Sequence, residues 1–250
     1  MSVAMVVFVV LFVSVSLVTI GTRRIELPRD SGLEAIESPE AARAYERINE
    51  WPQFRLLRRL VAGRLARYQP AGILADIGCG PGRLAVLIAR RHSTIRVVGV
   101  DASEEMVETA AAYAASLGLA GRVEFRLGDV ARLPLPDGSI EFAVSTLSLH
   151  HWADPARGLE EIHRVLKPGG QLLLFDLRRD PRRFAYWVVR FATGVVVPPA
   201  LRRAGEPLGS LLSSYTVGEV RRLFAGLPFG QYEVDGRAAW AFTWARKPGG

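Results

Sequence analysis

The residues from 74 to 85, LADIGCGPGRLA, place three glycines at alternate positions directly after a short apolar run. Gly78, Gly80 and Gly82 are the glycines, and Asp76 precedes the first of them by two residues. A glycine-rich turn between a first strand and a helix lets the backbone approach a ligand closely, because no side chain stands in the way. A carboxylate at the mouth of that turn would repel a pyrophosphate and attract a cation. The segment therefore predicts a turn that binds a ligand with cationic groups.

A second acid, Asp101, ends the apolar run IRVVGVD and lies 19 residues after Gly82. An acid at the end of the second strand suits the hydroxyl groups of a ribose. The glycine spacing is G-x-G-x-G, whereas dinucleotide-binding proteins have G-x-G-x-x-G. For Gly80, Pro81 and Gly82 taken alone, an ordinary tight turn is the alternative interpretation.

Two adjacent histidines, His150 and His151, are the candidates for acid–base chemistry. They lie in SLSLHHWADP, at the predicted carboxyl end of a strand, where open α/β sheets bind their ligands. Histidine suits proton transfer because its ordinary pKa is near 6.5. The alternative is a structural role, with one ring packing against the following loop beside Trp152.

Five short apolar runs, rich in β-branched residues, predict the strands that position these groups. They cover residues 72–78, 95–101, 122–129, 140–148 and 170–177, with helical patterns at 83–91, 104–117 and 156–166. Strands that alternate with helices indicate a parallel sheet covered on both faces. The segment KPGG (167–170) predicts a turn from the last of these helices into the fifth strand.

The last 75 residues contain a further helix and a hairpin. Thr216 and Glu219 have the spacing of a capping box at the start of a helix. The segment from 229 to 247 predicts two strands that meet at Asp235-Gly236 as an antiparallel hairpin.

The first 22 residues contain no charged side chain, and a helix of that length would span about 33 Å, enough to cross a bilayer. A cleaved signal peptide is the alternative, but a basic start and a small-x-small cleavage site are not evident. Arg23, Arg24 and Arg29 follow the segment, which predicts a cytoplasmic domain after a single membrane span. Ser38-Pro39 predicts the start of the next helix.

The charge of the chain is +7 and is supplied mainly by arginine. Five arginines and no acid occur between residues 51 and 70, and seven arginines against two aspartates between 176 and 203. Such patches suit an anionic membrane surface or a nucleic acid, and a solvated basic face is the alternative. Cys79 is the only cysteine, so no intrachain disulfide can form, which suits a reducing compartment.

Four segments in order resemble the successive motifs of the class I S-adenosylmethionine-dependent methyltransferases: LADIGCGPGRLA, VVGVDAS, LGDVARLPLPDGSIEFAVS and HRVLKPGGQLLLFDL. They are especially similar to the type 11 group, which includes the ubiquinone and menaquinone methyltransferases. The resemblance covers roughly residues 40–246 but not 178–215. It implies S-adenosylmethionine as cofactor and a Rossmann-like, doubly wound, mostly parallel sheet of seven strands with a C-terminal antiparallel hairpin.

The resemblance also implies a role for each matching residue. Asp76 would face the methionine end of the cofactor, and Asp101 would hold both ribose hydroxyls. The other matching positions form the turn, lie beside the adenine, or run past the methionine moiety. The residues of the turn are Gly78, Cys79, Gly80 and Gly82. The residues expected beside the adenine are Ala102, Met106, Asp129 and Val130. Ser145 and Thr146 are expected to run past the methionine moiety.

The acceptor is expected to be a small, hydrophobic molecule such as a quinone or a lipid. The insertion at 178–203 is apolar, aromatic and framed by arginines, which fits either an interfacial helix or an ordinary lid over a soluble substrate. No Asn/Asp-Pro-Pro-aromatic motif follows the fourth strand, which argues against DNA amino-methylation, and Cys79 in the first motif is not the nucleophile of a cytosine C5 enzyme. No nucleic-acid partner and no metal site are expected, because no ligand spacing is evident.

These observations predict an anchor at 1–22, a juxtamembrane linker at 23–37 and a methyltransferase domain at 38–250, with a substrate-side insertion at 178–215. Two other functions remain open. One is a protein that binds the cofactor without turnover. The other is a nicotinamide-dependent oxidoreductase, which the glycine spacing and Asp76 disfavour.

Overall fold

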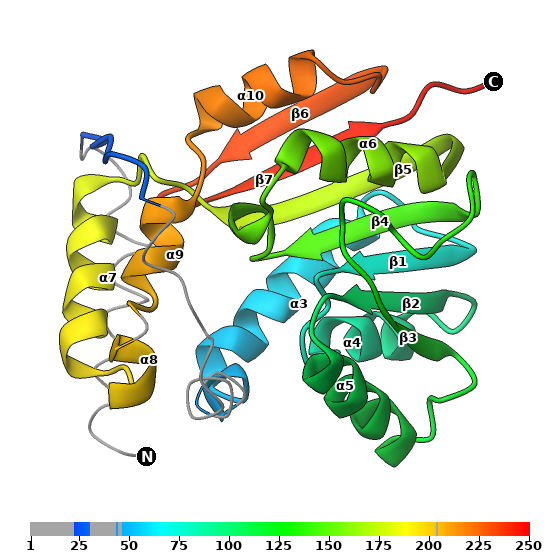
Figure 1. The fold of residues 1–250 in the computed structure, drawn as a ribbon, viewed down its shortest axis with the longest axis horizontal. Helices are drawn as coiled ribbons and strands as arrows, with labels where there is room; N and C mark the ends of the chain where they lie inside the picture. The colour runs from blue at the N-terminus through cyan, green and yellow to red at the C-terminus, as the bar shows by residue number, and fades with distance from the viewer. Residues whose placement is uncertain (1–22, 31–43, 45–46, 204) are drawn as a thin grey trace. The chain divides into compact units, whose positions relative to one another are not determined.

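A computed structural model describes residues 23–30, 44, 47–203 and 205–250 of the chain (Figure 1). The predicted membrane span at 1–22 and the predicted helix start at Ser38-Pro39 lie outside these residues. The chain divides into two units, one made of 56–175, 221–235 and 242–250 and the other of 1–55, 176–220 and 236–241. The first unit carries most of a seven-stranded sheet.

The order of the strands in the sheet is β3-β2-β1-β4-β5-β7-β6. The pairs β1–β2, β2–β3, β1–β4 and β4–β5 are parallel. This arrangement confirms the predicted Rossmann-like sheet. The strands are β1 (Ile73–Ile77), β2 (Arg96–Asp101), β3 (Val123–Leu127), β4 (Ile140–Thr146), β5 (Leu166–Leu177), β6 (Gln231–Gly236) and β7 (Trp240–Arg246).

Helices alternate with the first strands, as the sequence predicts, and α4 and α5 both pack against β2 and β3. From β1 the chain proceeds outward to β2 and β3, then returns to β4 on the other side of β1 and continues to β5. Right-handed crossovers in these two directions place α4 and α5 on one face and α6 on the other. The direction of the chain switches between β1 and β4, and open α/β sheets bind their ligands at the carboxyl ends of the strands at such a switch. The helices around these strands are α3 (Pro52–Ala66), α4 (Arg83–Arg91), α5 (Glu104–Ser116), α6 (Pro155–Val165) and α10 (Val217–Ala225).

The central strands are buried along almost their whole length. Leu74, Ala75, Phe142 and Val144 are all at most 1% exposed, and Leu172 in β5 is fully buried. Strands that are apolar on both sides are typical of a parallel sheet covered by helices on both faces. The core therefore holds the carboxyl ends of β1 and β4 in fixed positions.

The C-terminal hairpin is present, with its turn at residues 237–239, slightly after the predicted Asp235-Gly236. Two backbone hydrogen bonds show that β7 runs antiparallel to β5. Near the start of β5, Gly169 N–H donates to Pro248 O after the end of β7 at 3.0 Å. After the end of β5, Arg178 N–H donates to Ala239 O before the start of β7 at 2.9 Å. The prediction of a turn at KPGG (167–170) is wrong. These residues belong to strand β5, because pairing with the β7 side keeps the segment extended despite the positive φ of 77° at Gly169.

The second unit contains α7 (Arg183–Val195), α8 (Pro199–Arg203) and α9 (Leu208–Ser213). The predicted capping box is confirmed: Thr216 N–H donates to the Glu219 carboxylate at 2.7 Å, and Glu219 N–H donates to Thr216 Oγ1 at 3.1 Å. Among the described residues no single helix is long and apolar enough to cross a membrane. Within the described part of the chain, only α7 and the segment Pro199–Ser213 taken together are long and apolar enough to cross a membrane. The two helical segments form an angle of 118° at the break between them.

Residues 23–30 form an extended segment, which we call the strap. Its Ile25 N–H donates to Pro181 O at 3.1 Å, and its Asp30 N–H donates to Leu212 O at 3.2 Å. The buried Arg179 side chain donates from Nε to Leu27 O at 2.9 Å and forms an ion pair with Glu219 at 2.7 Å. The strap therefore satisfies polar groups of the second unit that would otherwise be buried without a partner.

Candidate functional site

The glycine-rich turn connects β1 to α4, as the sequence predicts. Gly78, Gly80 and Gly82 all have positive φ, at 68°, 50° and 70°. The turn is fixed by Gly78 N–H, which donates to Val100 O of β2 at 2.8 Å. A Cβ atom on Gly78 would lie 2.1 Å from Ser148 Oγ, so the loop after β4 excludes any side chain at this position. Glycine is therefore required here by both the backbone conformation and the close approach of Ser148.

Asp101 lies at the carboxyl end of β2, beside the glycine-rich turn. Its carboxylate accepts hydrogen bonds from Gly80 N–H at 2.7 Å and from Ser103 N–H at 3.0 Å. Ser103 in turn caps α5 by accepting a hydrogen bond from Met106 N–H at 3.3 Å. A carboxylate offers about four lone-pair positions, so Asp101 keeps acceptor capacity for a ligand. The proposed contact with ribose hydroxyls stays a prediction.

Asp76 is the most strongly perturbed acid at this edge of the sheet. It is 1% exposed, and burial, with a smaller effect from the charge of Asp101, raises the pKa of its carboxyl group to about 7. One oxygen accepts a hydrogen bond from Ala85 N–H in the first turn of α4. The other oxygen, Oδ2, has no hydrogen-bond partner among the described residues.

Two hydroxyl groups on the neighbouring strand β4 are also buried without a hydrogen-bond partner among the described residues. Ser145 Oγ and Thr146 Oγ1, at the end of β4, are buried and have no hydrogen-bond partner in the described part of the chain. Asp76 pairs in register with Val144, so Asp76 and Thr146 project from the same face of the sheet. Ser145, which pairs with Ile77, projects from the other face. Buried polar atoms without partners are rare in folded proteins, because each costs about 1–3 kcal/mol. The oxygens of Asp76 and Thr146 fit a ligand that brings hydrogen-bond donors, and the acid favours an ammonium group.

The perturbed pKa of Asp76 predicts an unusual pH dependence of stability. The pKa in the folded protein, about 7, lies above the ordinary 3.8, so this group's contribution to stability is complete below pH 4 and is lost as the pH rises through 7. An Asp76→Asn variant cannot ionise. Without ligand, it should unfold at a higher temperature than the unchanged protein at pH 8, and the difference should shrink toward pH 5. Thermal unfolding across this range is the measurement, with Glu108→Gln on the exposed side of α5 as control. A difference that does not vary with pH would contradict the assignment.

His150 and His151 lie in a short 3-10 helix, η1 (Leu149–His151), directly after β4, as predicted. The two rings are 4.1 Å apart between centroids. His150 is buried, at 4% exposed, whereas His151 is exposed. Ser148, which covers Gly78, also accepts a hydrogen bond from Trp152 Nε1 at 2.9 Å and so fixes this turn next to the glycine loop. Only His151 can reach a molecule in solvent without rearrangement of the turn.

The remaining predicted positions lie along the same edge. Gly128 N–H donates to Asp101 O at 2.9 Å, which brings the segment with Asp129 and Val130 beside the end of β2. Asp129 itself accepts a hydrogen bond from Ala131 N–H at 2.7 Å. Ala102, which precedes α5, is exposed, and Met106 in the first turn of α5 is half-buried. The fold therefore brings the predicted set to the carboxyl ends of β1, β2, β3 and β4.

Cys79 has no accessible thiol. It is 8% exposed, and burial, with smaller effects from Asp76 and Asp101, raises the pKa of its thiol. Its Sγ atom lies 3.6 Å from Gly80 O. A buried thiol with a raised pKa is a poor nucleophile, so Cys79 supports the turn rather than reacting.

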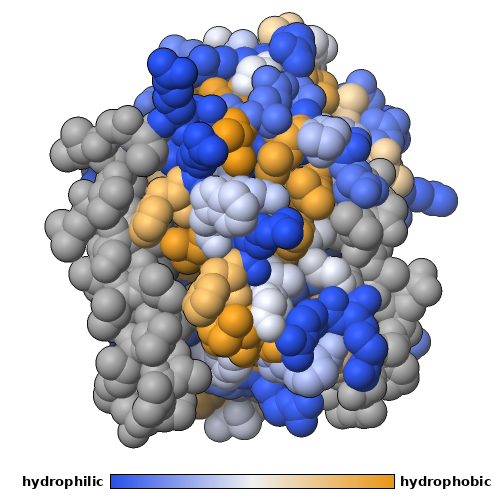
Figure 2. All heavy atoms as spheres, turned by 90° about the vertical axis from the view of Figure 1, so that its left-hand side faces the viewer, coloured by the Kyte–Doolittle hydropathy of each residue, from blue (hydrophilic) through white to orange (hydrophobic). Residues whose placement is uncertain are grey.

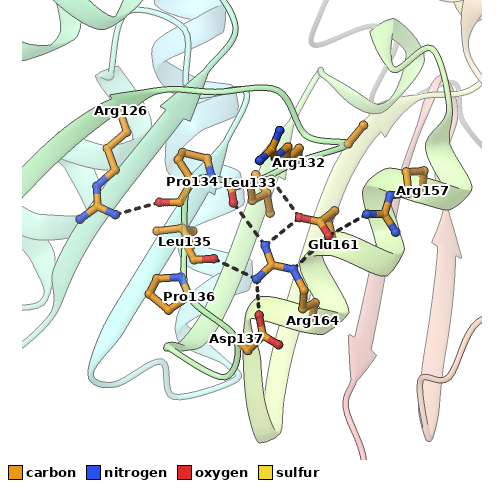
Figure 3. Close-up of a pocket in the computed structure, with 11 residues that line it drawn as sticks. Arg126, Arg132, Leu133, Pro134, Leu135, Pro136, Asp137, Arg157, Glu161 and Arg164 are labelled. Atoms are coloured by element: carbon orange, nitrogen blue, oxygen red, sulfur yellow. Dashed lines mark hydrogen bonds and ion pairs between the residues drawn. The ribbon is translucent and has the colours of Figure 1, made fainter.

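A cavity of about 760 Å³ lies elsewhere in the first unit, between residues 131–137 and α6 (Figure 3). Its centre is Arg164, which bonds to Leu133 O, Leu135 O and the carboxylates of Asp137 and Glu161 at 2.5–3.2 Å. Bonding to Arg164 is the main cause that lowers the pKa of Glu161. These charges are satisfied within the protein, and none of the predicted residues lines the cavity. The candidate functional site is therefore the strand edge, where buried groups of the described residues lack partners.

The sequence analysis missed this arginine network. The i, i+3 and i+4 spacing of Arg157, Glu161 and Arg164 in a helix is a signal for an ion-pair row. Asp137, however, is 27 residues from Arg164 and joins it only through the fold. Among the described residues, no group of three His, Cys, Asp or Glu side chains is arranged to hold a metal ion.

Residues 75–174 match the family model described as a methyltransferase domain. The chain is 32% identical over 169 residues to 2-phytyl-1,4-naphtoquinone methyltransferase of Nostoc sp., covering 64% of this chain and 72% of the relative. It is 36% identical over 157 residues to the O-methyltransferase resE of Aspergillus sclerotiorum, covering 62% and 57%. The chain spans less than two thirds of several curated relatives, including 37% of a transposon-encoded protein of Streptomyces fradiae and 51% of UbiE of Geotalea daltonii.

Solved structures share the fold. An S-adenosylmethionine-dependent methyltransferase of Aquifex aeolicus is 23% identical, with a TM-score of 0.56 over 74% of this chain and 88% of its own. The [4+2]-cyclase SpnF is 25% identical, with a TM-score of 0.54 over 97% and 93%. One fold thus serves both a methyltransferase and a cyclase, so fold alone does not fix the reaction.

Proposed function

Since the chain belongs to the S-adenosylmethionine-dependent methyltransferases related to the quinone-biosynthesis enzymes, we propose that it transfers a methyl group from this cofactor to a small, hydrophobic acceptor. The observation that carries the proposal is the pair of buried oxygens of Asp76 and Thr146, which lack partners among the described residues, beside a glycine turn tied to Asp101. A cofactor with an amino-acid end and a ribose supplies donors for both places.

The cofactor, when bound, supplies an activated methyl group, and the protein's task is alignment and exclusion of water. Positioning of two reactants can contribute on the order of 7–11 kcal/mol to lowering a barrier. Asp76 and Thr146 would hold the amino-acid end, and Asp101 the ribose, whereas the expected role of Ser145 stays a prediction. Gly80, with nothing within 4 Å of the position of a Cβ atom, leaves room for contact between the backbone and the ligand. A general base is needed only where the acceptor must lose a proton.

Of His150 and His151, we propose His151 as the acceptor of that proton, because its ring is exposed at the carboxyl end of β4 whereas the ring of His150 is buried. We expect His151→Gln to lower turnover by about 10²–10⁴-fold and to leave cofactor affinity unchanged. His150→Gln, at the buried neighbour, should act mainly on thermal stability. Turnover against pH for both variants is the measurement. A His151→Gln enzyme with the unchanged rate and pH profile would exclude a role as base.

A quinone- or lipid-like acceptor is supported by two observations. The Nostoc relative is named for a naphthoquinone substrate, and the matched Aspergillus relative for O-methyl transfer. Residues 178–203 add a long apolar and aromatic insertion. Both favour a hydrophobic acceptor, methylated on carbon, oxygen or nitrogen.

A membrane location is part of the proposal. Residues 1–22 form an uncharged stretch of the length needed to span a bilayer, and Arg23, Arg24 and Arg29 follow it. This pattern supports a single span with the domain on the cytoplasmic side.

A protein that binds the cofactor without methyl transfer is the second candidate. The similarity to a [4+2]-cyclase favours it, because that protein shares the fold and is named for another reaction. A nicotinamide-dependent oxidoreductase is disfavoured by the G-x-G-x-G spacing and by the buried Asp76.

Label transfer separates these candidates. The full chain is placed in host membranes with methyl-labelled S-adenosylmethionine, beside an Asp101→Ala control, and products are divided into organic and aqueous phases. Label in the organic phase that depends on Asp101 supports the proposal. Label only in the aqueous phase excludes a lipid-like acceptor. Cofactor binding without any labelled product supports the second candidate.

A further inference from the structure

Helix α7 exposes large apolar side chains along one face. Trp187, Phe191 and Val195 follow at intervals of four residues and are 54%, 48% and 67% exposed. Residues at this spacing lie above one another on a helix. Figure 2 shows this side, with apolar side chains gathered and bordered by hydrophilic ones. The three residues form a continuous apolar stripe, which we call the α7 stripe.

The opposite face of α7 is the buried one, and Val188 and Val189 on it are half-buried. Ala185 and Ala192 are its buried side chains, and Ala185 packs with Ala238 and Ala239. A helix on the surface of a globular protein normally buries its large apolar residues and exposes its polar ones. Helix α7 instead leaves Trp187, Phe191 and Val195 about half exposed or more, so this stripe is adapted to a surrounding other than water.

The charge around the stripe is positive. Residues 181–205 contain five arginines and no acid. Arg183 and Arg190 are exposed on the helix itself, and the Arg190 guanidinium lies 5.8 Å from the centroid of the Trp187 ring. Arg202, also exposed, donates to Gly194 O at 2.7 Å near the end of α7. A tryptophan beside arginines is typical of the boundary between headgroups and acyl chains, and each arginine near an anionic lipid surface contributes about 1 kcal/mol.

We propose that the α7 stripe lies in the plane of an anionic lipid bilayer, with Trp187, Phe191 and Val195 inserted at the headgroup boundary and the arginines on lipid phosphates. The positive charge opposes a second copy of this face as the occupant, because two such faces would repel each other. The inference deepens the proposed function and rests on its membrane location. It states which surface of the domain meets the lipid from which a hydrophobic acceptor would come.

The test uses a fluorophore that reports the polarity around one residue. Phe191→Cys in the full chain is labelled with an environment-sensitive dye, and buried Cys79 does not compete for the reagent. The matched control is Glu108→Cys, at an exposed position of α5. Both proteins are reconstituted into vesicles of phosphatidylcholine with phosphatidylglycerol. If the proposal is correct, the dye at position 191 emits at a shorter wavelength in vesicles than in water and is quenched by brominated lipid. The dye at position 108 shows neither effect.

A second protein tests the charge. Arg183→Glu with Arg190→Glu, in the Phe191→Cys background, should lose the shift and the quenching, whereas lysine at both positions should retain them. High salt should also weaken the contact, because the Debye length falls to about 3 Å at 1 M. Aqueous emission at position 191 in anionic vesicles would overturn the proposal. So would a shift without lipid that grows with protein concentration, which indicates a second copy. Neither readout requires cofactor or turnover, so a negative label-transfer result does not affect it.

Discussion

An Asp101→Ala variant is expected to lose cofactor binding by at least a hundredfold while remaining folded. The carboxylate holds the glycine turn through Gly80 N–H at 2.7 Å and the start of α5 through Ser103 N–H at 3.0 Å. Its remaining acceptor positions are those proposed for the ribose hydroxyls. Hydrogen bonds to charged groups contribute about 1.5–3 kcal/mol each, so loss of two such bonds to the ligand gives a factor of a hundred or more.

Calorimetric titration with S-adenosylhomocysteine measures this effect, and thermal unfolding shows that the fold is intact. Asp101→Asn keeps the volume and one acceptor oxygen, so it should bind more tightly than the alanine variant and more weakly than the unchanged protein. Glu108→Ala, also an acid-to-alanine change, alters an exposed site and should leave binding unchanged. Tight binding by Asp101→Ala would contradict the assignment of the ribose site.

A Gly82→Ala substitution should destabilise the protein by about 2–4 kcal/mol. Gly82 has φ of 70°, and a Cβ atom there would lie 2.7 Å from Phe125 Cζ and 2.8 Å from Ala110 Cβ. Phe125 also covers Gly99 of β2, so the ring has little room to withdraw. The expected loss therefore has two parts, backbone strain and overpacking.

Gly80→Ala separates these two parts. Gly80 has φ of 50°, but nothing lies within 4 Å of the position of its Cβ atom. Only the cost of the left-handed conformation remains, about 1–2 kcal/mol. For a protein of this size 1 kcal/mol lowers the melting temperature by about 2–4 °C, so the two variants should differ measurably in thermal unfolding. Equal losses would show that packing against Phe125 contributes nothing.

The sequence is sufficient to predict the parts of the site that depend on neighbouring residues. The alternation of glycines fixes the turn after β1, because the positive φ values at Gly78, Gly80 and Gly82 are a local property of the backbone. The order of strands and helices then brings Asp101 and the histidines to one edge of the sheet. These expectations follow from local periodicity and from the handedness of crossovers.

Features that depend on distant partners could not be predicted in the same way. The KPGG segment has turn-forming residues, yet Gly169 and Gly170 pair with Pro248 and Lys247 in the sheet. Ser148 covers Gly78 from a loop 70 residues later in the chain, and neither residue alone indicates the contact. In α7 the sequence shows apolar residues but not which of them face inward, and Ala185 is buried against Ala238 and Ala239, more than 50 residues later. Each case required a contact between segments far apart in the sequence.

The strap determines how much of the N-terminus can be removed in a shortened form of the protein. A chain that begins at Arg23 retains the bonds of Ile25, Leu27 and Asp30 to the second unit. A chain that begins after Asp30 leaves the buried Arg179 Nε without the Leu27 carbonyl, at a cost of about 1–3 kcal/mol. For crystallisation or binding studies in the absence of detergent, the natural cut therefore falls between Thr22 and Arg23.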